Sequence, residues 1–442
     1  YGQVVRVGYN KVSVSDVSEL KRILATHKYI KGQHYEKGLF LPPTIFSTTN
    51  PEHNRKRRRQ MGSMYTMKSM QQLQDKVIDM GVKALISEWD KKIDSGSGMA
   101  EVNYFYGFHS IAVDIIGALG FGQSFGVLKQ NDRRIIDGLH KMVMLVVMRG
   151  CVGLLGRFPW LAKSLNDGRL YVTRVAQRSI AKRHAEIQEA KCEKPVDILQ
   201  KLIDAHDPVT RENISGAELT SEMILLLVAG TDTTSNTLSW TLMHLLNHPA
   251  VLYRLQSDIR GAFAEPNQMI RFEEARERLP YLTAVIYESM RLHPAVSGYL
   301  TRVVPRHGTT LASRYFAPHL TEICISFAAC HRDTQVWTDP DAFDPERFMG
   351  PDAEQHKRNV MAFSSGVRMC IGRNLAWIEL YTVLANILRK YDFSLPKDSP
   401  YGPHRLTHTK QNEPQSIPGL AFTTFGPENP SHNCRINIAF AE

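Results

Sequence analysis

A single cysteine, Cys370, lies in a short segment whose composition favours a reactive or metal-binding sulfur. Residues 363–372 read FSSGVRMCIG, and a helix is predicted to follow them directly. Free N–H groups and peptide dipoles at a helix N-terminus favour a thiolate over a thiol. Gly366 and Gly372 would let the backbone approach a flat partner closely, and Phe363 could pack beneath that partner. A lone cysteine is more often structural, but this pattern favours a thiolate ligand of an iron porphyrin.

A second group of polar residues interrupts a long apolar segment. Residues 229–235 read AGTDTTS. The Thr233 hydroxyl can donate back to the Ala229 carbonyl, which weakens or bends a helix, and Gly230 removes a side chain at the same place. The gap would admit dioxygen and a water over a bound plane, with Asp232 and Thr233 delivering protons. Alone, this segment would more often be a polar patch where helices cross; together with Cys370 it favours oxygen activation.

Composition places the chain among ordinary globular proteins. It has 442 residues, of which 43% are hydrophobic and 22% charged. Its formal net charge of +10 favours an acidic partner surface, an anionic membrane or nucleic acid. The basic run at residues 54–61 has little aromatic interleaving and no recognised nucleic-acid module near it, so nucleic acid is not expected as a partner. Six cysteines without a CxxC pair indicate a reducing compartment and argue against a zinc site.

One long helix is expected to carry the polar segment. Ser215 and Glu218 have the S-x-x-E spacing of a capping box, which predicts a helix over residues 216–247. This helix is apolar nearly all round, so it should be buried. Residues 3–15 alternate like two strands joined by a turn, and residues 51–294 are mostly helical in periodicity.

The remaining elements complete a mainly α fold with a small β-rich portion. A helix is expected from Pro280 to about residue 293, and a last buried helix from 373 to about 391. Short strands are expected over residues 295–350, and NCRINIAF near the end is the clearest further strand. No linker, repeat or low-complexity tract divides the chain, and no apolar run reaches the roughly 18 residues of a membrane-spanning helix. We therefore expect one large domain, residues 1–442.

Four motifs together resemble the cytochrome P450 family, in the family's order and over most of the chain. FSSGVRMCIG is similar to its heme-binding loop, F-x-x-G-x-R-x-C-x-G. Glu288 and Arg291 form its E-x-x-R pair, residues 345–348 read PERF, and residues 229–234 match its oxygen-activating A-G-x-D-T-T.

The resemblance implies a set of functional residues. Cys370 would be the axial ligand of heme b, Thr233 and Asp232 would deliver protons, and Glu288, Arg291 and Arg347 would form a buried structural triad. The other residues expected at the cofactor are His53, Arg57, Ala229, Gly230, Arg302, Phe363, Gly366, Arg368 and Gly372. Of these, His53 and Arg57 would occupy the family's W-x-x-x-R positions at a heme propionate, with His replacing Trp. The expected substrate pocket comprises Phe46, Leu225, Val228, Ala295, Val296 and Phe422.

The resemblance also implies an activity and partners. A monomeric monooxygenase would insert one oxygen atom from O2 into a hydrophobic small molecule, with NADPH-derived electrons arriving from a separate NADPH-cytochrome reductase through its acidic flavoprotein surface. Arg368 and the loop around it resemble eukaryotic, membrane-anchored members, and fungal ones in particular. This predicts secondary metabolism at the cytosolic face of the endoplasmic reticulum, with an N-terminal anchor missing from this chain. Oxidative coupling, desaturation or rearrangement on the same fold, and a non-catalytic heme sensor, remain alternatives.

Overall fold

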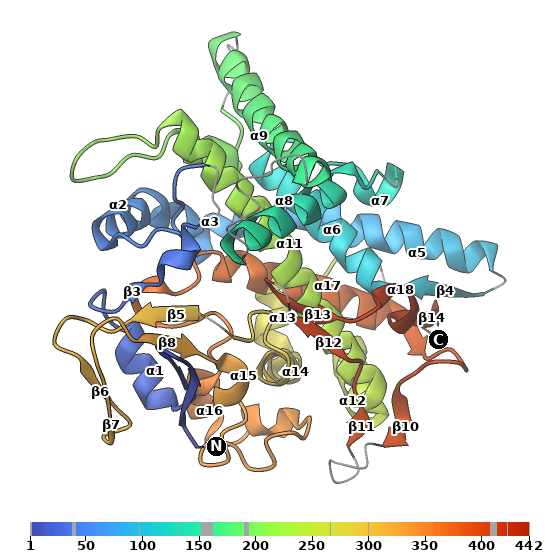
Figure 1. Cartoon of the computed structure of the whole chain (residues 1–442). Coiled ribbons are helices and arrows are strands. Elements are labelled where there is room, and N and C mark those ends of the chain that lie inside the picture. Colours follow the sequence, from blue (N-terminus) through green and yellow to red (C-terminus); the bar gives the residue numbers. More distant parts are fainter. Residues whose placement is uncertain are drawn as a thin grey trace.

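Helices dominate the computed structural model, and short strands gather into small sheets toward its edges (Figure 1). The structure describes residues 2–37, 41–96, 98–130, 132–151, 162–189, 194–265, 267–298, 300–406, 413–421 and 423–441. The mainly α architecture with a small β-rich portion agrees with the sequence-based prediction.

The helices and strands have the following bounds. The α-helices are α1 (Val17–Leu24), α2 (Pro51–Met61), α3 (Met67–Gln71), α4 (Gln74–Val77), α5 (Lys83–Ser95), α6 (Tyr104–Gly120), α7 (Val127–Gln130), α8 (Arg134–Cys151), α9 (Lys163–Glu189), α10 (Ile198–Ile203), α11 (Gly216–Asn247), α12 (Pro249–Ala262), α13 (Phe272–Arg278), α14 (Pro280–Leu292), α15 (Phe327–Cys330), α16 (Ala353–Asn359), α17 (Arg373–Lys390) and α18 (Pro430–Asn433). The strands are β1 (Val4–Gly8), β2 (Lys11–Val14), β3 (Ile30–Lys31), β4 (Met99–Asn103), β5 (Leu300–Val303), β6 (Thr309–Leu311), β7 (Tyr315–Ala317), β8 (Glu322–Ile325), β9 (Tyr391–Ser394), β10 (Gly402–Leu406), β11 (Pro414–Gln415), β12 (Gly419–Ala421), β13 (Phe425–Pro427) and β14 (Arg435–Phe440). Tighter or wider helical turns are η1 (Gln33–Tyr35), η2 (Gly62–Tyr65), η3 (Ile78–Val82), η6 (Pro345–Phe348) and η7 (Gly366–Arg368).

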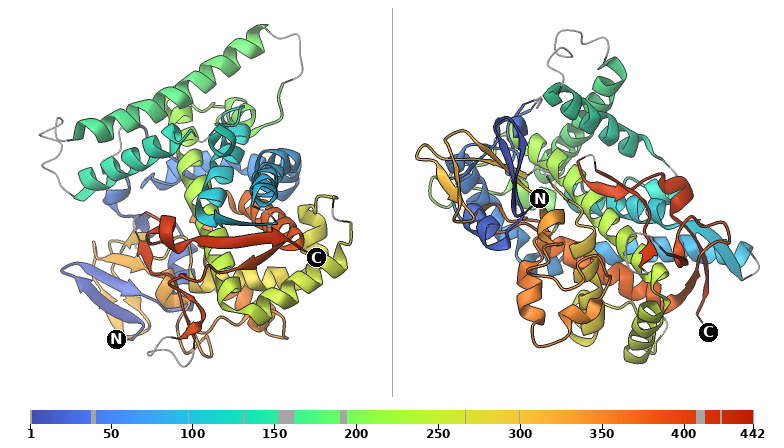
Figure 2. Two further views of the ribbon diagram at one scale, coloured as in Figure 1. Left: turned by 90° about the vertical axis from the view of Figure 1, so that its right-hand side faces the viewer. Right: turned by 60° about the horizontal axis from the view of Figure 1, so that its bottom comes forward.

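Helix α11 crosses the middle of the molecule (Figures 1 and 2). It begins with the predicted capping box, in which Ser215 and Glu218 each bond the backbone of the other. Most of its side chains are buried, because its sequence offers apolar or small residues on nearly every face. Helix α6 packs closely along it, because Gly230 has no side chain that would keep the two helices apart.

The largest sheet lies beside the N-terminus and has the strand order β1-β2-β8-β5-β3. The predicted hairpin of residues 3–15 is confirmed as β1 and β2, which pair antiparallel. Strand β2 then pairs parallel with β8, and β5 pairs antiparallel with both β8 and β3. The predicted C-terminal strand is also confirmed as β14, which lies between β4 and β9.

Two clusters of buried apolar side chains hold these parts together. The larger one joins the helices around α11, and the smaller one fills the space between α1 and the large sheet. Within the parts of the chain that the structure describes, none of the helices combines the length and the apolar character needed to span a membrane.

Candidate active site

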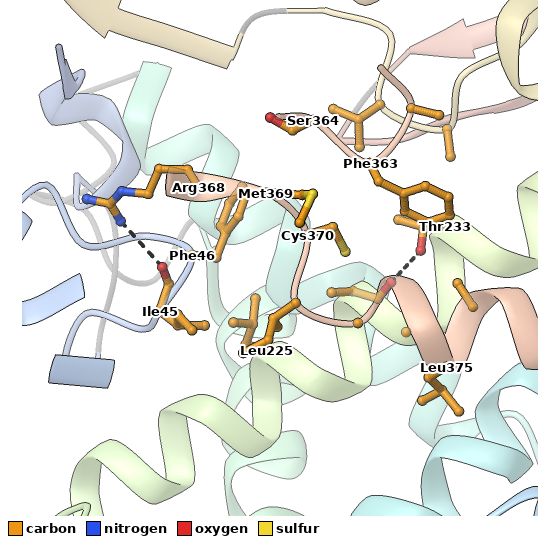
Figure 3. A pocket seen from close by; sticks show the side chains of 18 of the residues that line it. Ile45, Phe46, Leu225, Thr233, Phe363, Ser364, Arg368, Met369, Cys370 and Leu375 are labelled. Carbon is orange, nitrogen blue, oxygen red and sulfur yellow. Dashed lines mark hydrogen bonds between the residues drawn. The ribbon is translucent and has the colours of Figure 1, made fainter. Parts of the chain in front are cut away.

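A large cavity separates α11 from the segment 363–372 that carries the cysteine (Figure 3). The space between its walls amounts to about 1580 Å³ with the open mouth included. Its walls include Leu225, Leu226, Ala229, Gly230 and Thr233 from α11 and Phe363, Ser364, Arg368, Met369 and Cys370 from the opposite segment.

Cys370 presents its sulfur to this cavity. It is exposed there, whereas the other free thiols that the structure describes, Cys324, Cys330 and Cys434, are buried. Burial inside the protein raises the pKa of the Cys370 thiol, while the N–H group of Gly372 and the positive charge of Arg58 oppose that rise. A sulfur that opens to a cavity between N–H donors and a guanidinium is suited to bind a metal ion as a thiolate.

The glycines of the cysteine segment have different tasks. The amide of Cys370 closes the turn by donating to the Phe363 carbonyl over 2.9 Å. Gly366 has a φ of +64°, and a Cβ there would lie 2.1 Å from the carbonyl oxygen of Leu24. Gly366 therefore lets the segment dock on α1, which differs from the expected approach to a flat partner. Gly372 and Phe363 do line the cavity.

On the facing wall, α11 is shaped by Thr233 and Gly230. The Thr233 hydroxyl donates to the Ala229 carbonyl over 2.7 Å, which confirms the predicted hydrogen bond (Figure 3). A Cβ on Gly230 would lie 2.6 Å from Cδ1 of Ile116 in α6. The glycine thus allows α6 to approach, in addition to opening the cavity wall. The Thr233 hydroxyl stays within reach of a ligand in the cavity.

Asp232 lies on a neighbouring face of the same helix and is not part of the cavity wall. Its Oδ1 atom is 3.1 Å from Nε2 of His109 in α6. Adjacent helical residues point about 100° apart, and the carboxylate of Asp232 is directed toward α6 while Thr233 lines the cavity. The Asp232 carboxylate therefore has no direct contact with the cavity, and Thr233 lies between the two along the helix surface.

Four cationic side chains gather at one part of the cavity wall: Lys31, Arg58, Arg302 and Arg368. Each donates a hydrogen bond to a main-chain carbonyl oxygen, and none pairs with a carboxylate of the described residues. Burial and then repulsion from the other cations lower the pKa of Lys31, and they lower that of Arg368 to about 10. The Nε atom of Arg58 is buried without a partner. Guanidinium groups bind carboxylates bidentately, so this cluster fits a dianionic group such as a heme with its two propionates.

The structure does not bring His53 and Arg57 to the cavity. Arg57 is 1% exposed and forms ion pairs with Glu218 and Glu222 of α11. His53 Nε2 lies 3.4 Å from the Glu218 carboxylate. The next residue, Arg58, lines the cavity instead, because one step along α2 turns the side chain by about 100°. Arg58 is therefore the arginine of α2 that lines the cavity, and the expected contacts of His53 and Arg57 with a propionate stay a prediction.

The three residues of the expected triad do meet. Nε and Nη2 of Arg291 donate to the Glu288 carboxylate over 2.6 and 2.8 Å, and Nε of Arg347 lies 3.3 Å from the same carboxylate. Glu288 and Arg291 are fully buried. Arg291 also donates to the carbonyls of His331, Pro340 and Ala342. The pair thereby fixes the segment that follows α15.

His331 extends this network toward the cysteine segment, a role that no sequence motif indicated. Its Nδ1 atom lies 3.0 Å from the Arg291 carbonyl, and its Nε2 atom accepts from the amide of Met361. Burial, assisted by the charge of Arg291, lowers the pKa of His331 to about 3, so the ring is neutral as an acceptor requires. Met361 comes directly before the cavity-lining residues 362–364, so the triad reaches that wall through hydrogen bonds.

Most of the expected substrate pocket lines the cavity. Phe46, Leu225, Ala295 and Val296 are part of its wall. Val228 is not part of the wall, and its side chain packs against the apolar core. Phe422 lies outside the described residues.

Lys31 and Glu222 are cavity residues that the sequence analysis missed. Lys31 lies directly opposite Arg302 in the pairing of β3 with β5, a register that no local pattern reveals. Glu222 lies two turns before Ala229 on the cavity side of α11, and its spacing from the A-G-x-D-T-T motif is a signal that could have identified it.

Comparisons with known proteins agree with this architecture. The family model for cytochrome P450 matches residues 1–414. Cytochrome P450 monooxygenase helB1 of Aspergillus fumigatus is 31% identical over 99% of this chain and 75% of its own length. For helB2 of the same fungus the values are 33%, 99% and 87%. Among solved structures, the heme domain of cytochrome P450DA shares the fold with a TM-score of 0.82 at 18% identity, covering 99% of this chain and 89% of that one.

The chain therefore belongs to the cytochrome P450 family, a class of oxidoreductases that implies heme and iron. Because it is 31% and 33% identical to two fungal cytochrome P450 monooxygenases over 99% of its length, the chain is a cytochrome P450 monooxygenase.

Proposed function

We propose that residues 1–442 act as one heme-thiolate unit that inserts an oxygen atom from O2 into a hydrophobic small molecule. The observation that carries this proposal is the presence of the Cys370 sulfur and the Thr233 hydroxyl in the walls of one cavity (Figure 3). The electrons come from NADPH through a separate reductase at the cytosolic face of the endoplasmic reticulum, and the enzyme acts as a monomer in secondary metabolism. The net charge of +10 supports an acidic flavoprotein as partner.

In this proposal different residues bind the iron and the propionates of the cofactor. Cys370 binds the iron of heme b, and Arg58, Arg302, Arg368 and Lys31 neutralise its propionates. The bound heme iron supplies the chemistry that activates O2. Glu288, Arg291 and Arg347 keep the segment before Cys370 in place and take no part in the chemistry.

Thr233 and Asp232 would govern protons on the other wall. The Thr233 hydroxyl can hold a water or protonated group in the cavity, and Asp232 can exchange protons with His109 behind it. The apolar residues of the pocket, including Leu225 and Val296, exclude bulk water and select an apolar substrate.

The test is the absorption spectrum of the purified chain, reduced with dithionite and exposed to carbon monoxide. We expect the red-shifted Soret band of thiolate ligation in the wild-type protein and in Cys324→Ala, which changes a buried cysteine away from the cavity. Cys370→Ala should lack the band. If Cys370→Ala keeps both the band and turnover, the assignment of Cys370 is wrong.

Two of the alternatives, rearrangement on the same fold and the heme sensor, differ from a monooxygenase in how they consume NADPH. A monooxygenase consumes NADPH in response to substrate, whereas a rearrangement enzyme of the same fold needs no reductase and a sensor shows stable heme without consumption. The Thr233 hydroxyl at the cavity favours the first reading, because proton delivery is needed only where bound oxygen is cleaved.

A further inference from the structure

Two histidines and an aspartate from three different helices meet beside the active site, next to the face of α11 that lines the cavity. They are His109 in α6, His140 in α8 and Asp232 in α11. One ligand atom from each lies within 4.8 Å of the others, and His109 Nε2 is 3.1 Å from Asp232 Oδ1. Figure 1 shows these three helices close together in the upper half of the molecule. None of the motifs assigned to heme binding includes either histidine.

The chemistry of this group matches that of a transition-metal site. Imidazole nitrogen and carboxylate oxygen are common ligands of Zn2+, which they bind at about 2.0–2.2 Å. Tetrahedral ligands at that distance lie about 3.4 Å from one another. His109 and Asp232 already have this separation, so only His140 has to move. The cysteine pattern argues against zinc sites built on thiolates and does not concern this group.

The surroundings hold His109 and Asp232 in place and leave the exposed side chain of His140 able to rotate toward them. The His109 ring is buried and stacks on Phe105, with ring centres 5.9 Å apart and planes 24° apart. Asp232 is held by the backbone of α11, and its side chain is 23% exposed. His140 is exposed at the surface, so its side chain can rotate onto an ion that enters from solvent. This combination gives a preformed pair with an accessible entrance.

We propose that His109, His140 and Asp232 bind one divalent transition-metal ion of the Zn2+ type, with water as the fourth ligand. The site is separate from the heme ligand, since it uses no cavity-lining residue. Its consequence for catalysis rests on the proposed function: a bound ion would hold the Asp232 carboxylate and so prevent it from passing protons toward Thr233.

The direct test is calorimetric titration of the heme-loaded, tag-free chain with zinc chloride. We expect one ion per chain, with affinity reduced at least tenfold in His140→Ala and in Asp232→Asn. His140 is exposed, so its replacement should not impair folding. His432→Ala changes another exposed histidine, on α18, and should bind zinc like the wild type. Equal affinity in wild type and His140→Ala, or an equal loss in His432→Ala, would overturn the site.

A second measurement separates the metal site from the catalytic role of Asp232. Zinc at saturating concentration should slow substrate-dependent NADPH consumption in the wild type at least tenfold more than in His140→Ala. Calorimetric binding with unchanged turnover would support the metal site and contradict proton delivery through Asp232. If zinc inhibits the wild type and His140→Ala equally and binds both with equal affinity, the metal site is contradicted, whereas the proposed role of Asp232 in proton delivery is not.

Discussion

Two neighbouring arginines of α2 have different environments because they lie on different faces of the helix. Arg57 is buried against Glu218 and Glu222, whereas Arg58 lines the cavity beside the cysteine segment. The sequence could predict Cys370, Thr233 and the triad, because each belongs to a short motif with fixed spacing. It could not predict that Arg57 is buried against two glutamates and that Arg58 lines the cavity. A run of basic residues does not show which face of the helix will pack against the rest of the protein.

Replacement of each arginine should therefore give a different defect. Arg58→Ala removes one charge-assisted partner of the cofactor, which is worth about 1.5–3 kcal/mol, so the heme should be retained roughly 10- to 150-fold less tightly. Arg57→Ala leaves the buried Glu222 without its cation and should lower the free energy of unfolding by about 3 kcal/mol. Heme-to-protein ratios after transfer to apomyoglobin and urea unfolding measure the two effects.

Arg55→Ala is the matched control on the same helix, because Arg55 pairs only at the surface with Glu52 and its side chain is 43% exposed. It should change neither quantity. If Arg57→Ala releases heme while Arg58→Ala does not, the original alignment of the propionate motif is correct and the placement of α2 is wrong.

At the scale of elements, the turn at 363–370 depends on its contact with α1. Any side chain at Gly366 would collide with the backbone of Leu24 and would also have to adopt a positive φ. Gly366→Ala should therefore displace the turn, lower the melting temperature by several degrees and reduce heme content. Gly216→Ala, at the first turn of α11, meets nothing within 4 Å and should leave both quantities unchanged. Normal heme content and melting temperature in Gly366→Ala would contradict this docking.

The segment around Ile45 is held over the cavity by three other elements. Its amide donates to Glu222 of α11 over 2.7 Å, and its carbonyl accepts from Asn54 of α2 and Arg368 of the cysteine segment. Such contacts between distant parts of the chain cannot be read from local patterns. The parallel pairing of β2 with β8 is another example, since it joins residues 11–14 with residues 322–325.

Glu222 makes this attachment sensitive to pH. Burial raises its pKa to about 7 from an ordinary 4.5, against the opposing effects of the Ile45 amide and of Arg57. Because the folded-state value is the higher one, its contribution to stability is complete below about pH 4.5 and is lost as the pH rises through 7. Glu222→Gln cannot ionise, so its free energy of unfolding should decline less than that of the wild type over this interval.

Urea unfolding at a series of pH values measures that difference. Glu379→Gln is a useful comparison, because burial raises the pKa of Glu379 to about 8 and its effect should extend to higher pH. Parallel pH profiles for wild type and Glu222→Gln would contradict an ionisation of Glu222 in this range.

For the whole molecule, the distribution of charge differs from what the linear sequence suggests. The basic run on α2 is not a continuous outer surface, because Arg57 and Arg58 point inward. Lys56 pairs with Glu212, and Arg59 pairs with Asp207. Intramolecular pairs cancel in the total, and Lys31, Arg58, Arg302 and Arg368 line the cavity, so only part of the excess of ten positive charges lies on the outer surface. A reductase with an acidic surface would then be attracted by the long-range field of the molecule rather than by this run.

This attraction predicts a dependence on ionic strength. The Debye length falls from about 10 Å at 0.1 M salt to about 3 Å at 1 M, so added salt screens charges that attract the partner before contact. The KM for the reductase should rise several-fold between these salt concentrations, with a smaller change in the maximal rate. Turnover driven by hydrogen peroxide serves as the control, because the oxidant is neutral and needs no docking. A reductase KM that does not change with salt, while the peroxide reaction also stays constant, would mean that the contact is formed by apolar surfaces and that the net charge has no part in it.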